Sequence, residues 1–298
     1  MVSLSESVAL DDIRVLSTLF PKRHLCTGAC RVRRASLFAL REPIPRPVAI
    51  AVTVGVFAAL FAAWVVLSYG GFVRPLFLPT PTAVVQRAVT LYQQEILVRD
   101  IWISNFRVFS GFLMAVVVAV PLGILAGNLR IFAAAVNPFM GFIRYMPVPA
   151  FIPLLVLYAG IDEAPKILLI FIGTVVQMTI MVGDVTRQVQ ADLIRAAMVL
   201  GANSREIFRK VIWRGSLPGI VDVLRINLGF AWTYLVVAEL VAASEGMGFR
   251  ILRSQRFMQT DTIFLYILLI GMLGILFDLA FRLMHQFAFP WAHEQVRR

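Results

Sequence analysis

The chain has 298 residues, of which 59% are hydrophobic and only 15% are charged. Soluble domains carry about a quarter charged residues, so this composition leaves too few polar side chains to cover a water-exposed surface and indicates a membrane protein. The net charge of +11 does not indicate nucleic-acid binding, because the basic residues cluster between long apolar runs, as they do in membrane-flanking loops.

Residues 1–45 form a polar, basic tail that we expect to stay in the cytoplasm, and residues 46–298 form the predicted transmembrane domain. Two cysteines in the tail, Cys26 and Cys30, have no second pair of ligands nearby. We therefore interpret them as reduced thiols rather than as a metal site. No signal peptide precedes the first apolar run, which is expected to remain as an anchor.

Six apolar runs have the length that a membrane-spanning helix requires. At ~1.5 Å per residue the first extends about 30 Å, which matches the hydrocarbon core of a bilayer. We predict spans at residues 48–67, 106–127, 132–158, 167–182, 220–243 and 263–283. The second run contains Gly123 and Gly127, a spacing that permits close helix approach. The third is interrupted by prolines, which a buried helix tolerates when its neighbours satisfy the freed backbone groups: Pro138, Pro147, Pro149 and Pro153.

An even number of spans places both termini on one side of the membrane, and the charges indicate the cytoplasmic side. The tail and the segment 183–218 are rich in arginine and lysine, as cytoplasmic segments are. Arg250, Arg253 and Arg256 then face outward, against this rule. However, the first span and its tail usually dominate orientation. We therefore predict an all-α polytopic membrane protein with both termini in the cytoplasm.

The segment between the fourth and fifth runs, about residues 184–219, has the pattern of two short helices joined by a sharp bend. Gly201 follows a helical stretch, at the position where a helix end favours positive φ. Asn203 and Glu206 have the spacing of a capping box for the next helix, which is expected to end near Leu217-Pro218. Two rigid helices on the cytoplasmic side can transmit a partner's movement to the spans. The alternative is a hairpin that only packs on the membrane interface.

Short motifs in this segment resemble the "EAA" loop of binding-protein-dependent ABC importer permeases. They are Arg195-Ala196-Ala197, the Gly201 bend and Leu217-Pro218, with Arg195 in place of the glutamate that names the loop. An ordered set of further motifs covers residues 77–291 and resembles the nitrate/sulfonate/taurine permease family: Phe77-Leu78-Pro79-Thr80-Pro81, Pro147-Val148-Pro149, Ile152-Pro153-Leu154, Gly160-Ile161-Asp162, Ala238-Glu239-Leu240, Gly246-Met247-Gly248 and Thr260-Asp261-Thr262.

The resemblance implies the MetI-like transmembrane domain of a type I ABC importer, with about six transmembrane helices in the bacterial plasma (inner) membrane. It also implies a homodimer, two ATPase subunits that hold ATP and magnesium, and an extracytoplasmic solute-binding protein. The implied solute is small and often anionic, such as a sulfonate, taurine or nitrate. In this family the loop is the coupling helix that docks on the ATPase, a role that the resemblance carries to Arg195, Ala196, Ala197, Gly201, Ala202, Ser204, Leu217 and Pro218.

Polar and aromatic side chains inside the spans are candidates for the translocation pathway, because ionisable groups in lipid normally face the bundle interior. Glu239 is the sharpest case, and a hydrogen-bonded packing role near the outer interface is its alternative. The candidates, some of which are residue types that more often pack, are Tyr145, Met146, Gln177, Asn227, Trp232, Tyr234 and Glu239.

A second candidate site lies beyond the fifth span, where Arg250, Arg253 and Arg256 have helical spacing. Either these side chains form a solvated outer face, or they meet acidic residues of a docking binding protein or attract an anionic solute.

The chain lacks both a G-x-x-x-x-G-K-[ST] phosphate loop and an H-E-x-x-H metal motif. We therefore predict that it is not an enzyme, holds no cofactor or metal itself and depends on a separate subunit for ATP hydrolysis. One alternative is a secondary transporter driven by an ion gradient, but the matching broken helices typical of that class are missing. A membrane scaffold is another, and it leaves the paired-helix segment unexplained.

Overall fold

The computed structural model describes residues 45–290, so the basic tail with Cys26 and Cys30, and residues 291–298, lie outside the described part. All the regular secondary structure within residues 45–290 is helical, including one 3₁₀ helix (η1) and one π-helical segment (η2). The elements are α2 (Arg46–Tyr69), α3 (Pro81–Gln93), α4 (Ile96–Asn128), α5 (Arg130–Ile143), η1 (Val148–Phe151), α6 (Ile152–Ala159), α7 (Ala164–Arg187), α8 (Ala191–Val199), α9 (Ser204–Glu206), η2 (Ile207–Ile212), α10 (Trp213–Ala242), α11 (Met247–Arg256) and α12 (Thr260–Ala288).

Five of the helical segments are long and apolar enough to cross a membrane, and the bent pair formed by α5 and η1–α6 makes a sixth if it is counted as one span. The predicted all-α fold with about six spans is therefore confirmed. The helices extend beyond the predicted apolar runs; α4, for example, begins ten residues before the predicted second span. Hydropathy underestimates these lengths because the ends of the helices carry polar side chains.

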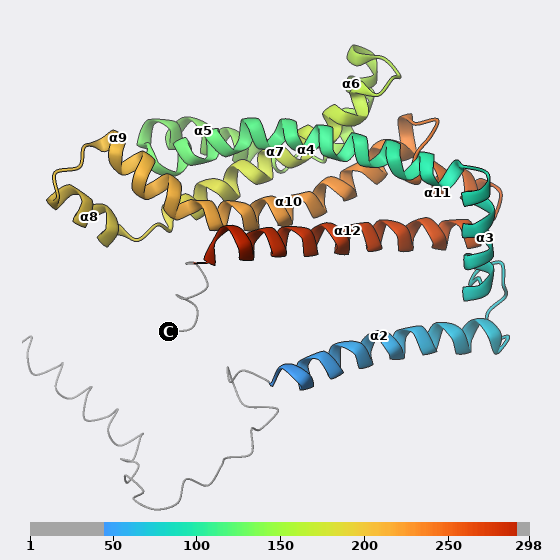
Figure 1. Ribbon diagram of the computed structural model, residues 1–298. Helices are drawn as coiled ribbons and strands as arrows, with labels where there is room; N and C mark the ends of the chain where they lie inside the picture. The colour runs from blue at the N-terminus through green and yellow to red at the C-terminus, as the bar shows by residue number, and fades with distance from the viewer. Residues whose placement is uncertain (1–44, 291–298) are drawn as a thin grey trace, which may run out of the picture. The chain divides into compact units, whose positions relative to one another are not determined.

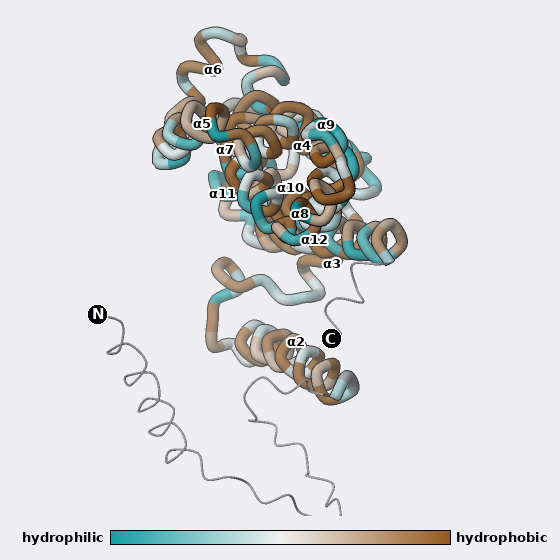
Figure 2. Tube along the Cα trace, turned by 90° about the vertical axis from the view of Figure 1, so that its left-hand side faces the viewer, coloured by the Kyte–Doolittle hydropathy of each residue, from teal (hydrophilic) through white to brown (hydrophobic). Residues whose placement is uncertain are grey.

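The chain divides into two units, residues 1–60 and 61–298. Of the first unit, the structure describes only the beginning of α2, whose apolar side chains are exposed. In the second unit α4, α7, α10 and α12 run side by side, with α8 and α9 at one end of the bundle and α11 at the other (Figure 1). Figure 2 shows hydrophobic residues on the outer sides of these helices as well as between them, as expected where the outer sides contact lipid.

Glycines of α4 set its close packing against α7. A Cβ atom added at Gly123 would lie 2.7 Å from the carbonyl oxygen of Thr179 and 2.7 Å from the Cβ of Val182. At Gly127 an added Cβ would lie 2.1 Å from Thr186 Oγ1. The predicted close approach of a neighbouring helix at these two glycines is therefore confirmed, and α7 is the neighbour.

The third predicted span, residues 132–158, is interrupted at prolines, as predicted. It consists of Arg130–Ile143 followed, after a short break, by Val148–Ala159, and the two parts are bent by 87°. Pro147 and Pro149 cause the break, because neither can donate a backbone hydrogen bond and each disfavours helical geometry in the residue before it.

The predicted end of the second cytoplasmic helix near Leu217-Pro218 is wrong. Residues Ser204–Leu240 form one continuous helical segment that contains α9, η2 and most of α10, and Pro218 lies inside α10. Proline is tolerated there because neighbouring helices and local adjustments can satisfy the backbone groups that it frees. The helix that begins at Ser204 and the fifth span are therefore one element.

Candidate coupling and translocation sites

The helix α8 projects from one end of the bundle, and none of its residues is buried. The apolar side chains at its C-terminal end are among the most exposed in the described chain, with Val199 87% and Leu200 86% accessible. An apolar helix end that no other part of residues 61–290 covers is typical of a surface that binds a partner.

The bend after α8 has the geometry that the sequence predicts. Gly201 has a φ of +81°, and its N–H donates to the carbonyl of Met198 at 3.0 Å. The N–H of Ala202 donates to the carbonyl of Ala197, also at 3.0 Å, which completes a Schellman motif. The left-handed glycine thus fixes the direction in which the chain leaves α8.

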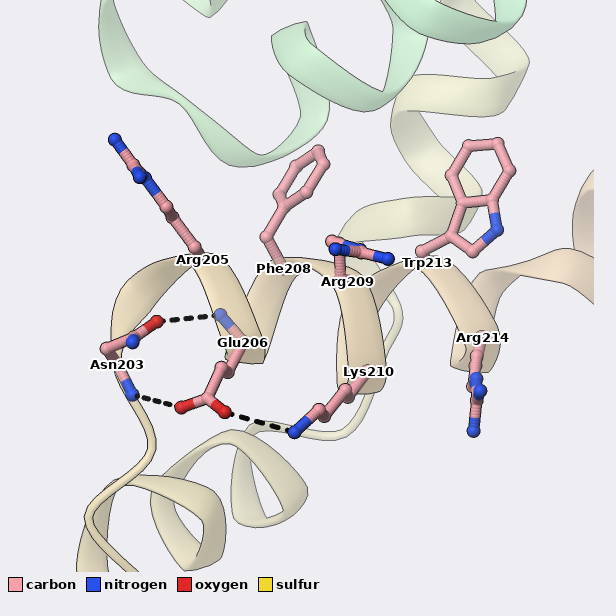
Figure 3. Close-up of a pocket in the computed structure, with 8 residues that line it drawn as sticks. All are labelled: Asn203, Arg205, Glu206, Phe208, Arg209, Lys210, Trp213 and Arg214. Carbon is pink, nitrogen blue, oxygen red and sulfur yellow. Dashed lines mark hydrogen bonds and ion pairs between the residues drawn. The ribbon is translucent and has the colours of Figure 1, made fainter.

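A capping box begins the next helix, as predicted. The Asn203 side chain accepts a hydrogen bond from the N–H of Glu206 at 2.9 Å, and the Glu206 carboxylate accepts one from the N–H of Asn203 at 3.2 Å. Lys210 donates to the same carboxylate at 3.0 Å (Figure 3). The helix that starts here continues without interruption into the membrane span, so a displacement at the cap can reach the span through a rigid element.

Next to this cap lies a hollow of about 680 Å³, which we call the basic hollow. Three of its cations, Arg205, Arg209 and Arg214, have no carboxylate partner within residues 45–290, whereas Lys210 pairs with Glu206. Figure 3 shows the hollow with its lining residues, Asn203, Arg205, Glu206, Phe208, Arg209, Lys210, Trp213 and Arg214. The hollow therefore has an excess of positive charge next to the exposed end of α8.

Arg195, at the position where the resembled loop has glutamate, is an exposed residue of α8. Its guanidinium lies 3.5 Å from the carboxylate of Asp192, one helical turn earlier. Both side chains are largely solvated, so this pair contributes little to stability.

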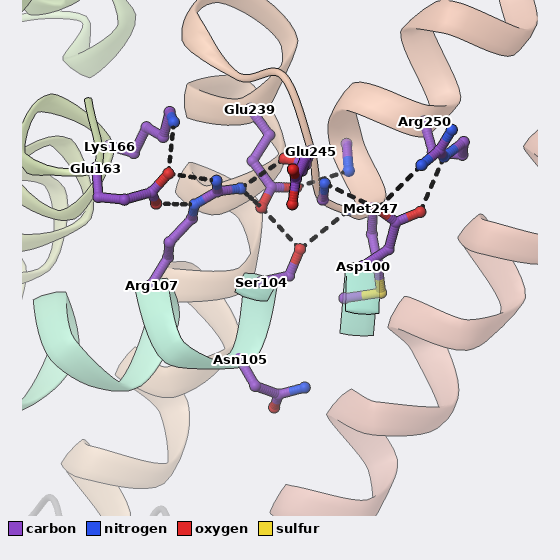
Figure 4. A network of polar contacts seen from close by, with 12 residues as sticks. Asp100, Ser104, Asn105, Arg107, Glu163, Lys166, Glu239, Glu245, Met247 and Arg250 are labelled. Carbon is purple, nitrogen blue, oxygen red and sulfur yellow. Dashed lines mark hydrogen bonds and ion pairs between the residues drawn. The ribbon is translucent and has the colours of Figure 1, made fainter. Parts of the chain in front are cut away.

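At the opposite end of the bundle, side chains of α4 and α10 bind the N-terminus of α11. Gly246, Met247 and Gly248 each have a backbone N–H that would otherwise be unpaired in the first turn. These groups donate to Asp100 (3.0 Å), Ser104 (3.0 Å) and Glu239 (2.7 Å), respectively. Figure 4 shows these contacts converging on the turn before α11.

The same turn explains why two of the resemblance motifs occur together. A Cβ added at Gly246 would lie 2.4 Å from the Glu239 carboxylate, and one at Gly248 would lie 2.9 Å from the Glu239 Cβ. The motif Ala238-Glu239-Leu240 thus packs directly against the motif Gly246-Met247-Gly248. The two glycines allow the backbone of the second motif to approach the Glu239 carboxylate.

Arg107 joins this turn to the start of α7. Its guanidinium donates to Glu239 and to the carbonyl of Glu245, both at 2.7 Å, and binds Glu163 through both carboxylate oxygens. Lys166 is a second partner of Glu163, at 2.9 Å. Arg107 and Glu239 are fully buried. We call Asp100, Arg107, Glu163, Lys166, Glu239 and Arg250 the buried ionic cluster; it contains three cations and three carboxylates.

The hydrogen bond from Arg107 is the main cause that lowers the pKa of Glu163 from 4.5 to about 2. Because the folded pKa lies below the unfolded one, the ion pairs of Glu163 contribute stability that is present above about pH 4.5 and is lost as the pH falls toward 2. We expect Glu163→Gln to have a lower melting temperature than wild type at neutral pH. The difference between the two melting temperatures (the gap) should narrow below about pH 4.5. A gap that stays constant between neutral and acidic pH would contradict this assignment.

The three arginines of α11 do not form one surface. Arg253 and Arg256 are exposed, as a solvated outer face requires. Arg250 instead binds Asp100, at 2.9 Å from its Nε, and Asp100 also accepts a hydrogen bond from Tyr266 at 2.7 Å. The expectation of a common solvated face is therefore wrong for Arg250, because the buried Asp100 needs a cation.

Three of the seven pathway candidates, Met146, Gln177 and Tyr234, line one small cavity of about 50 Å³ at the bend between α5 and η1. Tyr145 is exposed beside it. The remaining three, Asn227, Trp232 and Glu239, are buried within the bundle and do not line this cavity.

The sequence interpretation missed Arg144, which lines this cavity, and most of the buried ionic cluster. A signal for the cluster was present in α4, where Asp100, Ser104 and Arg107 recur at the helical period and so lie on one face. No comparable local pattern points to Arg144.

The family model of the binding-protein-dependent transport system inner membrane component matches residues 119–290. This chain belongs to that family. The match begins in α4 and extends through α12, so it includes the segment from α8 to α10. The prediction of an ABC permease is therefore confirmed over that of a secondary transporter.

Relatives and a solved structure agree with this assignment. A probable ABC transporter permease protein, BMEII0107 of Brucella melitensis, is 40% identical over 222 residues, which cover 74% of this chain and 89% of that protein. The taurine transport system permease protein TauC of Escherichia coli (strain K12) is 32% identical over 262 residues, which cover 86% of this chain and 94% of TauC. A chain of the MetNI methionine ABC transporter, in an inward-facing conformation, superimposes with a TM-score of 0.58 at 21% identity, over 64% of this chain and 95% of that one. The last likeness supports the fold.

Proposed function

We propose that this chain forms the translocation pathway of an importer and that α8, Gly201 and the continuous α9–α10 helix couple it to a separate ATPase subunit. The observation that carries the proposal is the exposed apolar end of α8, which is joined through a fixed bend to a helix that enters the membrane. In this role α8 contacts the ATPase, and α10 moves with it.

The ATPase subunits hold the ATP and magnesium, and their closure moves α8 toward or away from the bundle. Leu217 and Pro218 lie inside α10 and so pass this movement on without contacting the ATPase, whereas Ala196, Ala197 and Arg195 are part of α8 itself. Ala202 and Ser204 hold the bend between the two helices. This division of roles refines the single docking group that the resemblance implies.

The assembly contains two copies of this chain, two ATPase subunits and an external solute-binding protein, and both termini of the chain are cytoplasmic. The basic segment from α8 to α10 supports this orientation, since arginine and lysine are enriched in cytoplasmic loops. Arg253 and Arg256, exposed at the opposite end, are then available to an acidic surface of the binding protein.

The solute is small and anionic, of the sulfonate, taurine or nitrate type. The support is the 32% identity to a permease named for taurine transport, over nearly its whole length. Met146, Gln177, Tyr234 and Tyr145 are the candidates for contact with the solute, because they gather at the bend of the broken span. Asn227, Trp232 and Glu239 serve the packing of α10.

The test is association with the ATPase subunit. We expect Arg205→Glu/Arg209→Glu to weaken the binding of the ATPase to the purified chain about tenfold or more at low salt, because the basic hollow then repels an acidic partner surface. Arg253→Glu/Arg256→Glu, the same change of charge at the other end of the bundle, is the control and should leave this affinity unchanged. Equal affinities for wild type and both variants would refute docking at the basic hollow, and no binding by wild type would refute the proposed function.

A further inference from the structure

Arg144 follows α5 at the break of the third span, deep in the membrane region. The fourteen residues of α5 begin next to the end of α4 and run back along the bundle for about 21 Å (Figure 1). With the start of α5 placed at the edge of a hydrocarbon core of about 30 Å, Arg144 lies about two-thirds of the way across that core. The residues of α7 that line the same cavity as Arg144 support this depth, because they lie in the middle of α7: Gly173, Val176 and Gln177.

Arg144 is exposed and has no carboxylate partner within residues 45–290, unlike the cations that are buried in the bundle. Arg107, Lys166 and Arg250 each form an ion pair with a carboxylate of the buried ionic cluster. The contacts of Arg144 are with Tyr145, whose hydroxyl lies 3.2 Å from its Nη2 and whose ring centre lies 5.0 Å from its Cζ. An unpaired cation at this depth is costly in lipid, so its natural environment is a water-filled pathway.

The groups around Arg144 suit an oxyanion. Gln177 and Tyr234, which line the same cavity, carry an amide and a hydroxyl that can donate hydrogen bonds. A guanidinium presents two parallel N–H groups to sulfonate or carboxylate oxygens, and such charge-assisted bonds are strong where water is scarce. The cavity of about 50 Å³ has room for one or two waters and is too small to enclose the solute. The solute would therefore contact the guanidinium of Arg144 on the exposed side of this side chain.

We propose that Arg144 is the anion-binding residue of the translocation pathway, where its guanidinium binds the oxyanion group of the passing solute. The proposal rests on the proposed function and adds to it the residue that selects for negative charge. In this proposal the break between α5 and η1 positions the Arg144 side chain in the pathway.

The first test needs no knowledge of the solute. Tyr145→Cys, in a Cys26→Ser/Cys30→Ser background and in the complex with the ATPase, is labelled with an anionic and with a cationic methanethiosulfonate reagent. We expect the ratio of the anionic to the cationic labelling rate to fall about tenfold when Arg144→Gln is added, because the local positive potential is lost. Leu113→Cys, an exposed position in the middle of α4, is the lipid-facing control and should not react.

A second test measures ATP-driven uptake of taurine, methanesulfonate and nitrate into proteoliposomes with the cognate binding protein. Arg144→Lys should retain uptake of the solute that wild type transports, and Arg144→Met should lose it about tenfold or more, while both bind the ATPase as wild type does. Failure of wild type to bind the ATPase would count against the proposed function itself. Binding of the ATPase with an unchanged labelling ratio, or with full uptake by Arg144→Met, would overturn the inference on Arg144 alone.

Discussion

Replacing Arg107 with methionine is expected to destabilise the folded bundle by about 3–5 kcal/mol, because the change leaves the buried Glu239 carboxylate without its cation. Glu239 is fully buried and would keep only the hydrogen bonds from Ser104 and the N–H of Gly248. Glu163 would keep Lys166. The turn before α11 would lose its connection to the start of α7, and we expect the melting temperature in detergent to fall by about 10 °C.

The matched control is Arg99→Met, which removes an exposed arginine of the same helix from its pair with Glu245. A solvated pair of this kind contributes about 1 kcal/mol or less, so the control should change the melting temperature little. Adding Glu239→Met to Arg107→Met should recover part of the loss, because the unpaired buried charge is removed. Equal melting temperatures for Arg107→Met and Arg99→Met would contradict the structural role of the buried ionic cluster.

The second large effect is expected at Gly123, where valine should destabilise the packing of α4 on α7 by about 3 kcal/mol. The added Cβ would meet the Thr179 carbonyl oxygen and the Val182 Cβ at 2.7 Å, and backbone atoms cannot rotate away as a flexible side chain can. The helices must therefore separate. Since α4 and α7 form the most extensive helix pair of the bundle, the variant should lose melting temperature and also express poorly.

Gly229→Val in α10 is the control for this prediction. It makes the same change inside a membrane-spanning helix, but an added Cβ there has no neighbour within 4 Å. Both variants alter helix propensity alike, so the difference between their melting temperatures measures the close approach of α4 to α7. If Gly123→Val were as stable as Gly229→Val, the glycine contact would have no energetic importance.

The sequence predicted the features that depend on local signals. Apolar runs indicated the spans, since crossing a bilayer requires a minimum length of apolar helix. Gly201 and Asn203 predicted the bend and the cap, because positive φ and a capping side chain each favour few residue types.

Features that depend on tertiary contacts could not be predicted in this way. Arg107 and Glu239 are 132 positions apart, and no pattern along one chain identifies such a pair. The bend of 87° in the third span was equally out of reach, because prolines permit a break without fixing its angle. Pro218 shows the opposite case, in which a helix-breaking residue lies inside a helix that tertiary packing maintains.

The central claim is that α8 is coupled to the spans through the Gly201 bend. The most direct test measures ATP hydrolysis by the ATPase subunit assembled with this chain in lipid nanodiscs. The rate is compared with and without solute-loaded binding protein. Gly201→Asn should keep the stimulation by binding protein, because asparagine tolerates positive φ and the position has open space around it. Gly201→Pro should abolish it, because proline fixes φ near −65° and removes the N–H that donates to Met198. We predict that the binding protein stimulates ATP hydrolysis with wild type and with Gly201→Asn but not with Gly201→Pro. Equal stimulation with all three proteins would contradict the coupling of α8 to the spans.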